Sequence, residues 1–171
     1  MKKLLGVFLA AALTLGLASI AMAATDSGTG DVTITLEEIA QLDVVGGSIS
    51  FTFANTGTTA GSLPTVSDDT ATSLSWTSNV SANSRKITAQ LSADYTTGIV
   101  LKATVTVAGG NGTTGGIQTL VLASAKDMVT GITNENVTGN TVTYNATLSN
   151  MIAPVTNESK TVTWTLLAAA A

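Results

Sequence analysis

Short runs in which apolar and polar residues alternate recur along this chain from residue 32 onward. In KTVTWTLLA (160–168), Val162, Trp164 and Leu166 share one face of an extended chain, and threonines occupy the other face. A period of two residues is the pattern of a half-buried β-strand. Turn clusters separate the other runs of this kind, which cover 32–36, 48–53, 73–78, 85–91, 99–107, 117–123 and 140–148.

About eight such runs at hairpin spacing, without a convincing long helix between them, predict one all-β domain. We expect an antiparallel β-sandwich, Greek-key in topology and Ig-like or pilin-like in form. The last run is expected to be an integral strand with Trp164 in the core. Residues 37–45 (EEIAQLDVV) allow either a helical turn or a strand, and the run around MVTGIT is too weak to assign.

The first residues have the features of an export signal. Two lysines precede a long apolar stretch, and Ala21-Met22-Ala23 forms a small-residue cleavage site. We therefore predict a cleaved signal helix over 1–23, in preference to a membrane anchor, a flexible lead-in over 24–31 and a single domain over 32–171. The mature protein is predicted to be secreted, extracellular or at the cell surface, with no membrane segment.

The composition narrows the chemistry further. The chain has no His and no Cys, which removes the Ser-His-Asp triad, most zinc sites and any disulfide framework. Without the two lysines of the leader, five basic residues face eleven acidic ones, and this balance argues against nucleic acid as a partner. Thr, Ser and Asn fill most polar positions, as they do in extracellular β-structure.

Acidic residues stand next to one another at two places. In a strand, Glu37 and Glu38 would point to opposite faces, so they make no paired acid/base site, and the same holds for Asp68 and Asp69. Asp68-Asp69 lies in a polar loop that could hold calcium, although we favour an Asp-initiated turn as the explanation of the pair. We predict no enzyme, no catalytic residue and no cofactor, with calcium as the one candidate ion.

Two tryptophan segments lie in a characteristic order, SLSWTSN around Trp76 and TVTWTLLA around Trp164. This arrangement resembles WxL-domain proteins, which are secreted bacterial surface proteins with one Trp motif early in the domain and a second in its last strand. The second motif matches as Trp164-Thr165-Leu166, whereas the first has Ser78 where the family has Leu. The resemblance implies non-covalent attachment to the cell wall through peptidoglycan.

Two further functions fit the same sequence. A filament subunit could lend Val32, Ile34 and Leu36 as a donor strand to the open sheet edge of another copy; within one chain the same segment would be the first strand. A carbohydrate-binding module would need an exposed aromatic ring, for which Tyr95 is the best candidate. The predicted partners are therefore peptidoglycan or another surface polymer, or copies of the protein itself.

Overall fold

The structure is a computed structural model that describes residues 31–56, 58–81 and 84–169. The predicted signal peptide, and the lead-in up to residue 30, lie outside the described residues. The chain divides after Thr35 into two units, slightly beyond the domain start predicted at Val32. Residues 31–35 of the first unit carry neither helix nor strand, and the second unit, Leu36–Ala171, contains all the strands described below.

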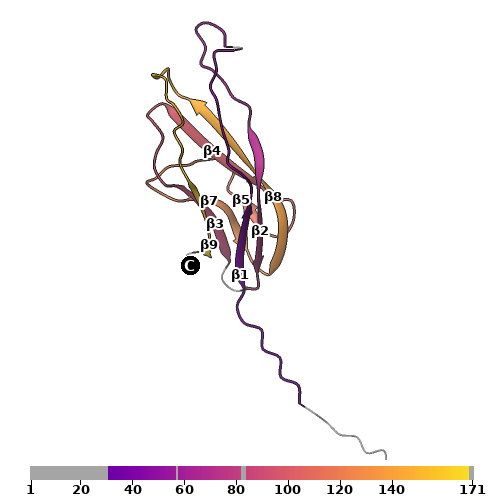
Figure 1. Cartoon of the computed structure of the whole chain (residues 1–171). Coiled ribbons are helices and arrows are strands. Elements are labelled where there is room, and N and C mark those ends of the chain that lie inside the picture. Colours follow the sequence, from indigo (N-terminus) through magenta and orange to yellow (C-terminus); the bar gives the residue numbers. More distant parts are fainter. Residues whose placement is uncertain (1–30, 57, 82–83, 170–171) are drawn as a thin grey trace, which may run out of the picture. The chain divides into compact units, whose positions relative to one another are not determined.

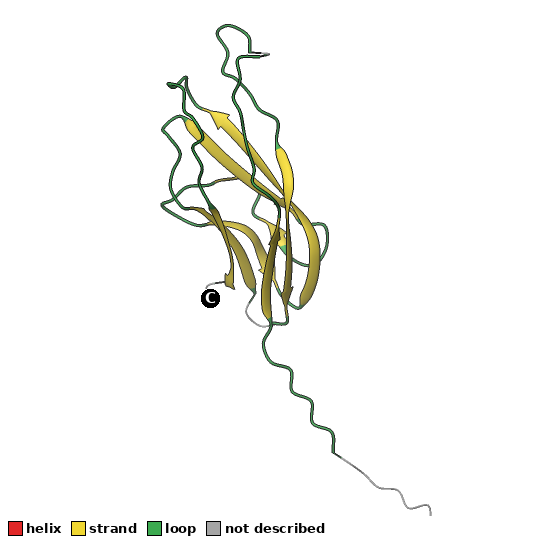
Figure 2. Ribbon diagram, in the orientation of Figure 1, coloured by secondary structure: helices red, strands yellow, loops and turns green. Residues whose placement is uncertain are grey.

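Two antiparallel sheets form the second unit, which confirms the predicted β-sandwich (Figures 1 and 2). The first sheet has the order β1-β2-β8-β4-β6 and the second has the order β5-β7-β3-β9. The strands are β1 (Ala40–Val45), β2 (Asp69–Ser78), β3 (Arg85–Leu91), β4 (Ile99–Thr106), β5 (Thr113–Thr114), β6 (Gln118–Thr119), β7 (Lys126–Ile132), β8 (Glu135–Leu148) and β9 (Val162–Ala168).

The core lies between the sheets and consists of the apolar faces that the alternation predicts. In β8, Val142 and Tyr144 are 0% and 3% exposed, and in β2 Trp76 is 1% exposed. Among the residues that the structure describes, one polar side chain, Asn140, is fully buried in this core. Its Oδ1 accepts a hydrogen bond from Ala108 N (2.9 Å) and its Nδ2 donates one to Leu74 O (3.2 Å), so both ends of the amide are paired.

Several runs depart from the sequence prediction. The run 32–36 and the run 48–53 form no strand, and in 117–123 only Gln118–Thr119 pairs. Conversely, the ambiguous segment 37–45 supplies β1, and the weak MVTGIT region lies within β7.

Gly46 marks the point at which the chain leaves the first sheet after β1. Val45 is the last residue of β1 to pair with β2, opposite Ser73. A Cβ on Gly46 would lie 2.7 Å from Thr72 Oγ1 and 2.9 Å from Thr72 Cα, so the chain passes β2 there at a distance that excludes a side chain. Beyond this close passage the chain runs extended through 48–53 without joining a ladder.

Candidate functional site

The segment before the sandwich presents three large apolar side chains to solvent. Val32, Ile34 and Leu36 are 85%, 87% and 75% exposed. They occupy alternate positions of an extended run whose other positions are Thr33 and Thr35. This is the amphipathic pattern of a strand with one buried face, but in the described chain no strand pairs with it.

Asn79 anchors the chain directly after this segment. Its Oδ1 accepts a hydrogen bond from Ile39 N (2.7 Å), and its Nδ2 donates one to Glu37 O (2.7 Å). The backbone of Asn79 also donates to Ile39 O at 3.4 Å. Residues 37–39 are therefore tied to the end of β2, and we call these three bonds the Asn79 clamp.

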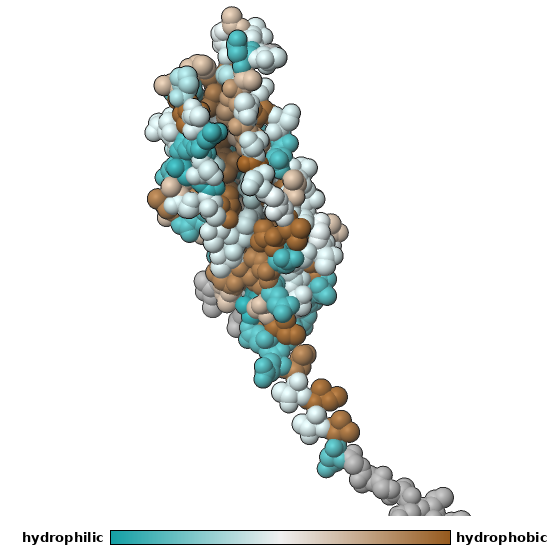
Figure 3. All heavy atoms as spheres, in the orientation of Figure 1, coloured by the Kyte–Doolittle hydropathy of each residue, from teal (hydrophilic) through white to brown (hydrophobic). Residues whose placement is uncertain are grey.

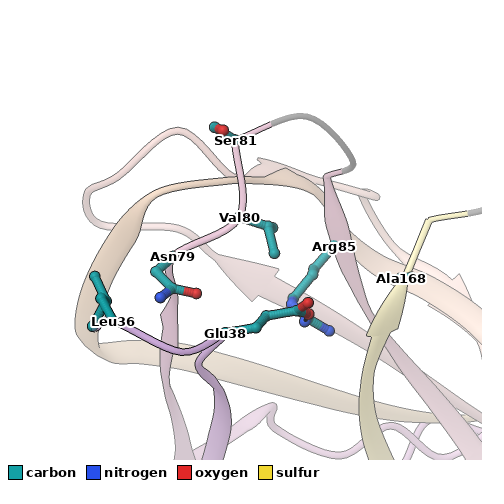
Figure 4. A pocket seen from close by; sticks show the side chains of 7 residues that line it. All are labelled: Leu36, Glu38, Asn79, Val80, Ser81, Arg85 and Ala168. Carbon is teal, nitrogen blue, oxygen red and sulfur yellow. Dashed lines mark hydrogen bonds and ion pairs between the residues drawn. The ribbon is translucent and has the colours of Figure 1, made fainter. Parts of the chain in front are cut away.

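An ion pair reinforces the clamp. Arg85, at the start of β3, donates to Glu38, and Figure 4 shows the two side chains pointing toward each other. They line a pocket of about 510 Å³ together with Leu36, Asn79, Val80, Ser81 and Ala168. Among the described residues, the buried Nε of Arg85 has no hydrogen-bond partner. The pair bridges the chain before β1 to the second sheet, so it adds to the anchoring of residues 37–39.

The outer strand β9 has a free side. Its seven residues pair in unbroken register with β3, from Leu91 opposite Val162 to Arg85 opposite Ala168, and no described strand pairs with its other side. The inward-facing Val162, Trp164 and Leu166 pack against the core but are only half-buried. A row of backbone groups and an incompletely covered apolar face thus lie at one sheet edge.

A second unpaired run lies against the same core. Ile49, Phe51 and Phe53 alternate along 48–53 and are half-buried against the core cluster. β1, which precedes this run, contacts β9 across the sandwich. Figure 3 shows apolar atoms at the surface along the strip between the chain that follows β1 and the chain that leads into β9. The apolar core is therefore less completely covered at this edge, beside β9 and the run 48–53, than at the centre of the sandwich.

The two tryptophans predicted to form a WxL-like pair have different surroundings. Trp76 is buried, and its Nε1 donates a hydrogen bond to Glu135 Oε1 at 2.6 Å. Trp164 is half-buried, and its Nε1 donates to the hydroxyl of Tyr144 at 3.2 Å, with the two rings edge to face at 6.5 Å. Both rings are core-facing, so only the outer flank of Trp164, together with Leu166 beside it, can contact another molecule.

Tyr95, the predicted glycan contact, is half-buried against the core cluster. Burial raises its pKa, and the charge of nearby Glu158 raises it further. The carboxylate of Glu158 accepts hydrogen bonds from Thr96 N at 3.1 and 3.2 Å, which lowers its own pKa, and it forms an ion pair with Lys160 at 3.2 Å. Tyr95 therefore belongs to a polar cluster that joins the 94–98 turn to the chain before β9.

Asp68 and Asp69 point to different partners. Asp69 is the first residue of β2, and its Oδ1 accepts from Ala71 N at 2.9 Å where the pairing with β8 is irregular, while Asp68 Oδ1 accepts from Asn145 Nδ2 at 2.6 Å. Across the described ranges, no three His, Cys, Asp or Glu side chains come together as metal ligands. In the same ranges, no helix is long and apolar enough to span a membrane.

The sequence predicts the alternating run 32–36, but it does not predict the Asn79 clamp or the Glu38–Arg85 ion pair that anchor the chain after it. Asn79 and Glu37 are 42 residues apart, and Arg85 and Glu38 are 47 residues apart. No local pattern announces contacts of this kind, although an Asn directly after a strand end is a common backbone-binding residue. The Glu135 partner of Trp76 was missed for the same reason.

Comparison with known proteins adds no relative to this picture. No family model, no curated protein and no solved structure matches the chain.

Proposed function

We propose that the protein is a non-enzymatic extracellular structural protein whose copies join into a filament, each lending residues 32–36 as a strand to the sandwich of a neighbour. The observation that carries the proposal is the exposure of Val32, Ile34 and Leu36 in an extended, unpaired run directly before an anchored domain start. A strand with one apolar face is stable only when another surface covers that face.

The energetic argument favours intermolecular pairing. Burying a Val, Leu or Ile side chain contributes about 1.5–3 kcal/mol, so three such side chains offer a substantial gain to any surface that accepts them. Strand addition to a sheet edge supplies backbone hydrogen bonds for affinity and side-chain pockets for specificity. The Asn79 clamp fixes the chain at residues 37–39, which gives the lent strand a defined starting point.

Attachment to peptidoglycan, which the WxL resemblance implies, stays a prediction, as does sugar binding through Tyr95. The burial of Trp76 favours a structural role for that residue over ligand contact. The experiment below includes peptidoglycan so that wall binding and self-assembly give different results.

The test compares two variants with the same added charge on opposite faces of the run. Ile34→Asp places a carboxylate on the apolar face, and the matched control Thr35→Asp places one on the polar face. Both positions are exposed, so neither change should unfold the domain. The exported protein and both variants are sedimented with and without isolated peptidoglycan, and the pellets are examined by negative-stain microscopy.

We expect fibres from the unchanged protein and from Thr35→Asp, with a loss of fibres in Ile34→Asp. Fibres from all three proteins would contradict donor-strand assembly. A protein that stays monomeric alone and pellets only with peptidoglycan would replace the filament proposal with wall attachment. If the protein stays soluble under both conditions, neither function holds and a glycan screen with Tyr95→Ala as control follows.

A further inference from the structure

We infer that the acceptor for the neighbour's residues 32–36 is the free edge of β9, which pairs with the incoming strand in antiparallel direction. The inference rests on the proposed function and adds the partner surface to it. A second copy of this chain is the occupant, because its own exposed run 32–36 fits within the seven-residue edge and shares its period and its apolar face.

Four of the described strands lie at sheet edges, namely β1, β6, β5 and β9, and they differ in their suitability as acceptors. β5 and β6 contain two residues each, which is too short to hold a five-residue run. β1 carries the charged Asp43 in its middle, a residue type that protects sheet edges from unwanted pairing. β9, with the sequence VTWTLLA, has no charge, no Pro and no Gly over seven residues.

The regular geometry of β9 supports this choice. Its register with β3 has no shift over its whole length, whereas the pairing of β3 with β7 has two. Natural sheet edges are usually shortened, bulged or charged, because an unprotected edge pairs with other chains. A long, regular and uncharged edge would therefore cause aggregation unless another strand covers it in the assembled protein.

The paired residues of β3 and β9 differ in burial, which shows where the apolar face of the second sheet is left uncovered. Ile87 and Ala89 of β3 are both 0% exposed, although they pair directly with Leu166 and Trp164, which are only half-buried. β3 has a neighbour on each side, while β9 has one. A further strand beside β9 would lay its apolar residues next to Trp164 and Leu166 and complete the cover.

The antiparallel direction follows the pairing already present in the sandwich. All pairings of the sandwich are antiparallel, and such ladders are slightly more stable per residue than parallel ones. In the central antiparallel register, Ile34 lies opposite Trp164 and Thr33 lies opposite Thr165.

Disulfide trapping tests the edge and the direction, and the chain suits it because it contains no cysteine. One batch of protein carries Thr33→Cys and a second carries Thr165→Cys, both at exposed positions on the outward face. Directly opposed residues of neighbouring strands come close enough for a disulfide. The batches are mixed, allowed to assemble, oxidised mildly and analysed by non-reducing gel and peptide mass spectrometry.

We expect the 33–165 disulfide to be the main cross-linked product, formed wherever a Thr33→Cys chain lends its strand to a Thr165→Cys chain. A matched mixture of Thr33→Cys with Thr163→Cys, which are opposed in the parallel arrangement, should give only a trace. Adding Ile34→Asp to the Thr33→Cys chain should remove the cross-link. Because the two cysteines are on separate chains, a strand folded back onto its own domain cannot produce the hetero-linked product.

The outcomes separate this inference from the proposed function. Fibres without the 33–165 disulfide would leave the filament in place and overturn β9 as its antiparallel acceptor. A dominant 33–163 disulfide would keep the edge but contradict the direction. If neither fibres nor disulfides form, the proposed function itself fails.

Discussion

β8 and β9 have nearly the same sequence pattern and very different surroundings. Both alternate apolar residues with threonines, and Tyr144 of β8 contacts Trp164 of β9 across the sandwich. β8 lies between β2 and β4, and its inward residues are almost fully buried, while β9 has a neighbour on one side and its inward residues are half-buried. The difference shows that alternation determines which side chains face the core, whereas the number of neighbouring strands determines how deeply they are buried.

The largest expected effect is a contrast between two identical substitutions. Trp76→Ala removes a fully buried ring and leaves Glu135 without its indole partner, so we expect a loss of about 3–5 kcal/mol in unfolding free energy. Trp164→Ala removes a half-buried ring at the edge and should cost about 1–3 kcal/mol in the monomer. Urea denaturation measures both, and equal losses would contradict the contrast between centre and edge.

A smaller effect is expected at the buried amide of β8. Asn140→Ala leaves Ala108 N–H and Leu74 C=O without their partner inside the core, which should lower the unfolding free energy by about 2–3 kcal/mol. Asn145→Ala on the same strand removes only an exposed bond to Asp68 and should change it by less than about 0.5 kcal/mol. If the two variants have the same urea midpoint, the buried hydrogen bonds of Asn140 contribute no more to stability than the exposed bond of Asn145.

The smallest expected effect is a pH dependence of the unfolding free energy, which compares Tyr144 in the core with Tyr95 in the 94–98 turn. Burial raises the pKa of Tyr144 and, at the rim, that of Tyr95 above the ordinary value of 10.0. Because the unfolded chain then ionises first, stability should be fully present below pH 10 and fall as the pH rises through the folded pKa values.

These are the two tyrosines of the chain, so two variants resolve their shares. Denaturation at several pH values between 8 and 11 should show a shallower alkaline loss in Tyr144→Phe and in Tyr95→Phe than in the unchanged protein. An unchanged slope in Tyr144→Phe would mean that its phenol ionises as freely in the fold as in the unfolded chain.

The strands with the clearest period were predicted from the sequence, and the failures have physical causes. Residues 85–91, 99–106 and 140–148 lie in strands because each finds a ladder partner. The run 48–53 alternates equally well, yet it passes beyond the close approach at Gly46 and has no partner within the described chain. A sequence period carries no information on whether a partner strand exists.

β7 is the converse case, a strand that has a partner but no clear alternation in its sequence. Its pairing with β3 shifts register around Met128, so that the adjacent Met128 and Val129 are both fully buried. A bulge of this kind places two successive side chains in the core and erases the alternation. The candidate site was found only in part, because the exposed run is a local pattern, while the Asn79 clamp joins residues far apart in the sequence.

The Asn79 clamp also determines how the domain responds to mechanical tension. A pull applied to the chain at Leu36 along the axis of β1 first meets the clamp and the Glu38–Arg85 ion pair, and then the ladder of β1. β1 is paired with β2 over its whole length, from Ala40 opposite Ser78 to Val45 opposite Ser73, so the load is shared in shear by all its bonds instead of opening them one at a time. The clamp and the ladder of β1 therefore resist such a pull together.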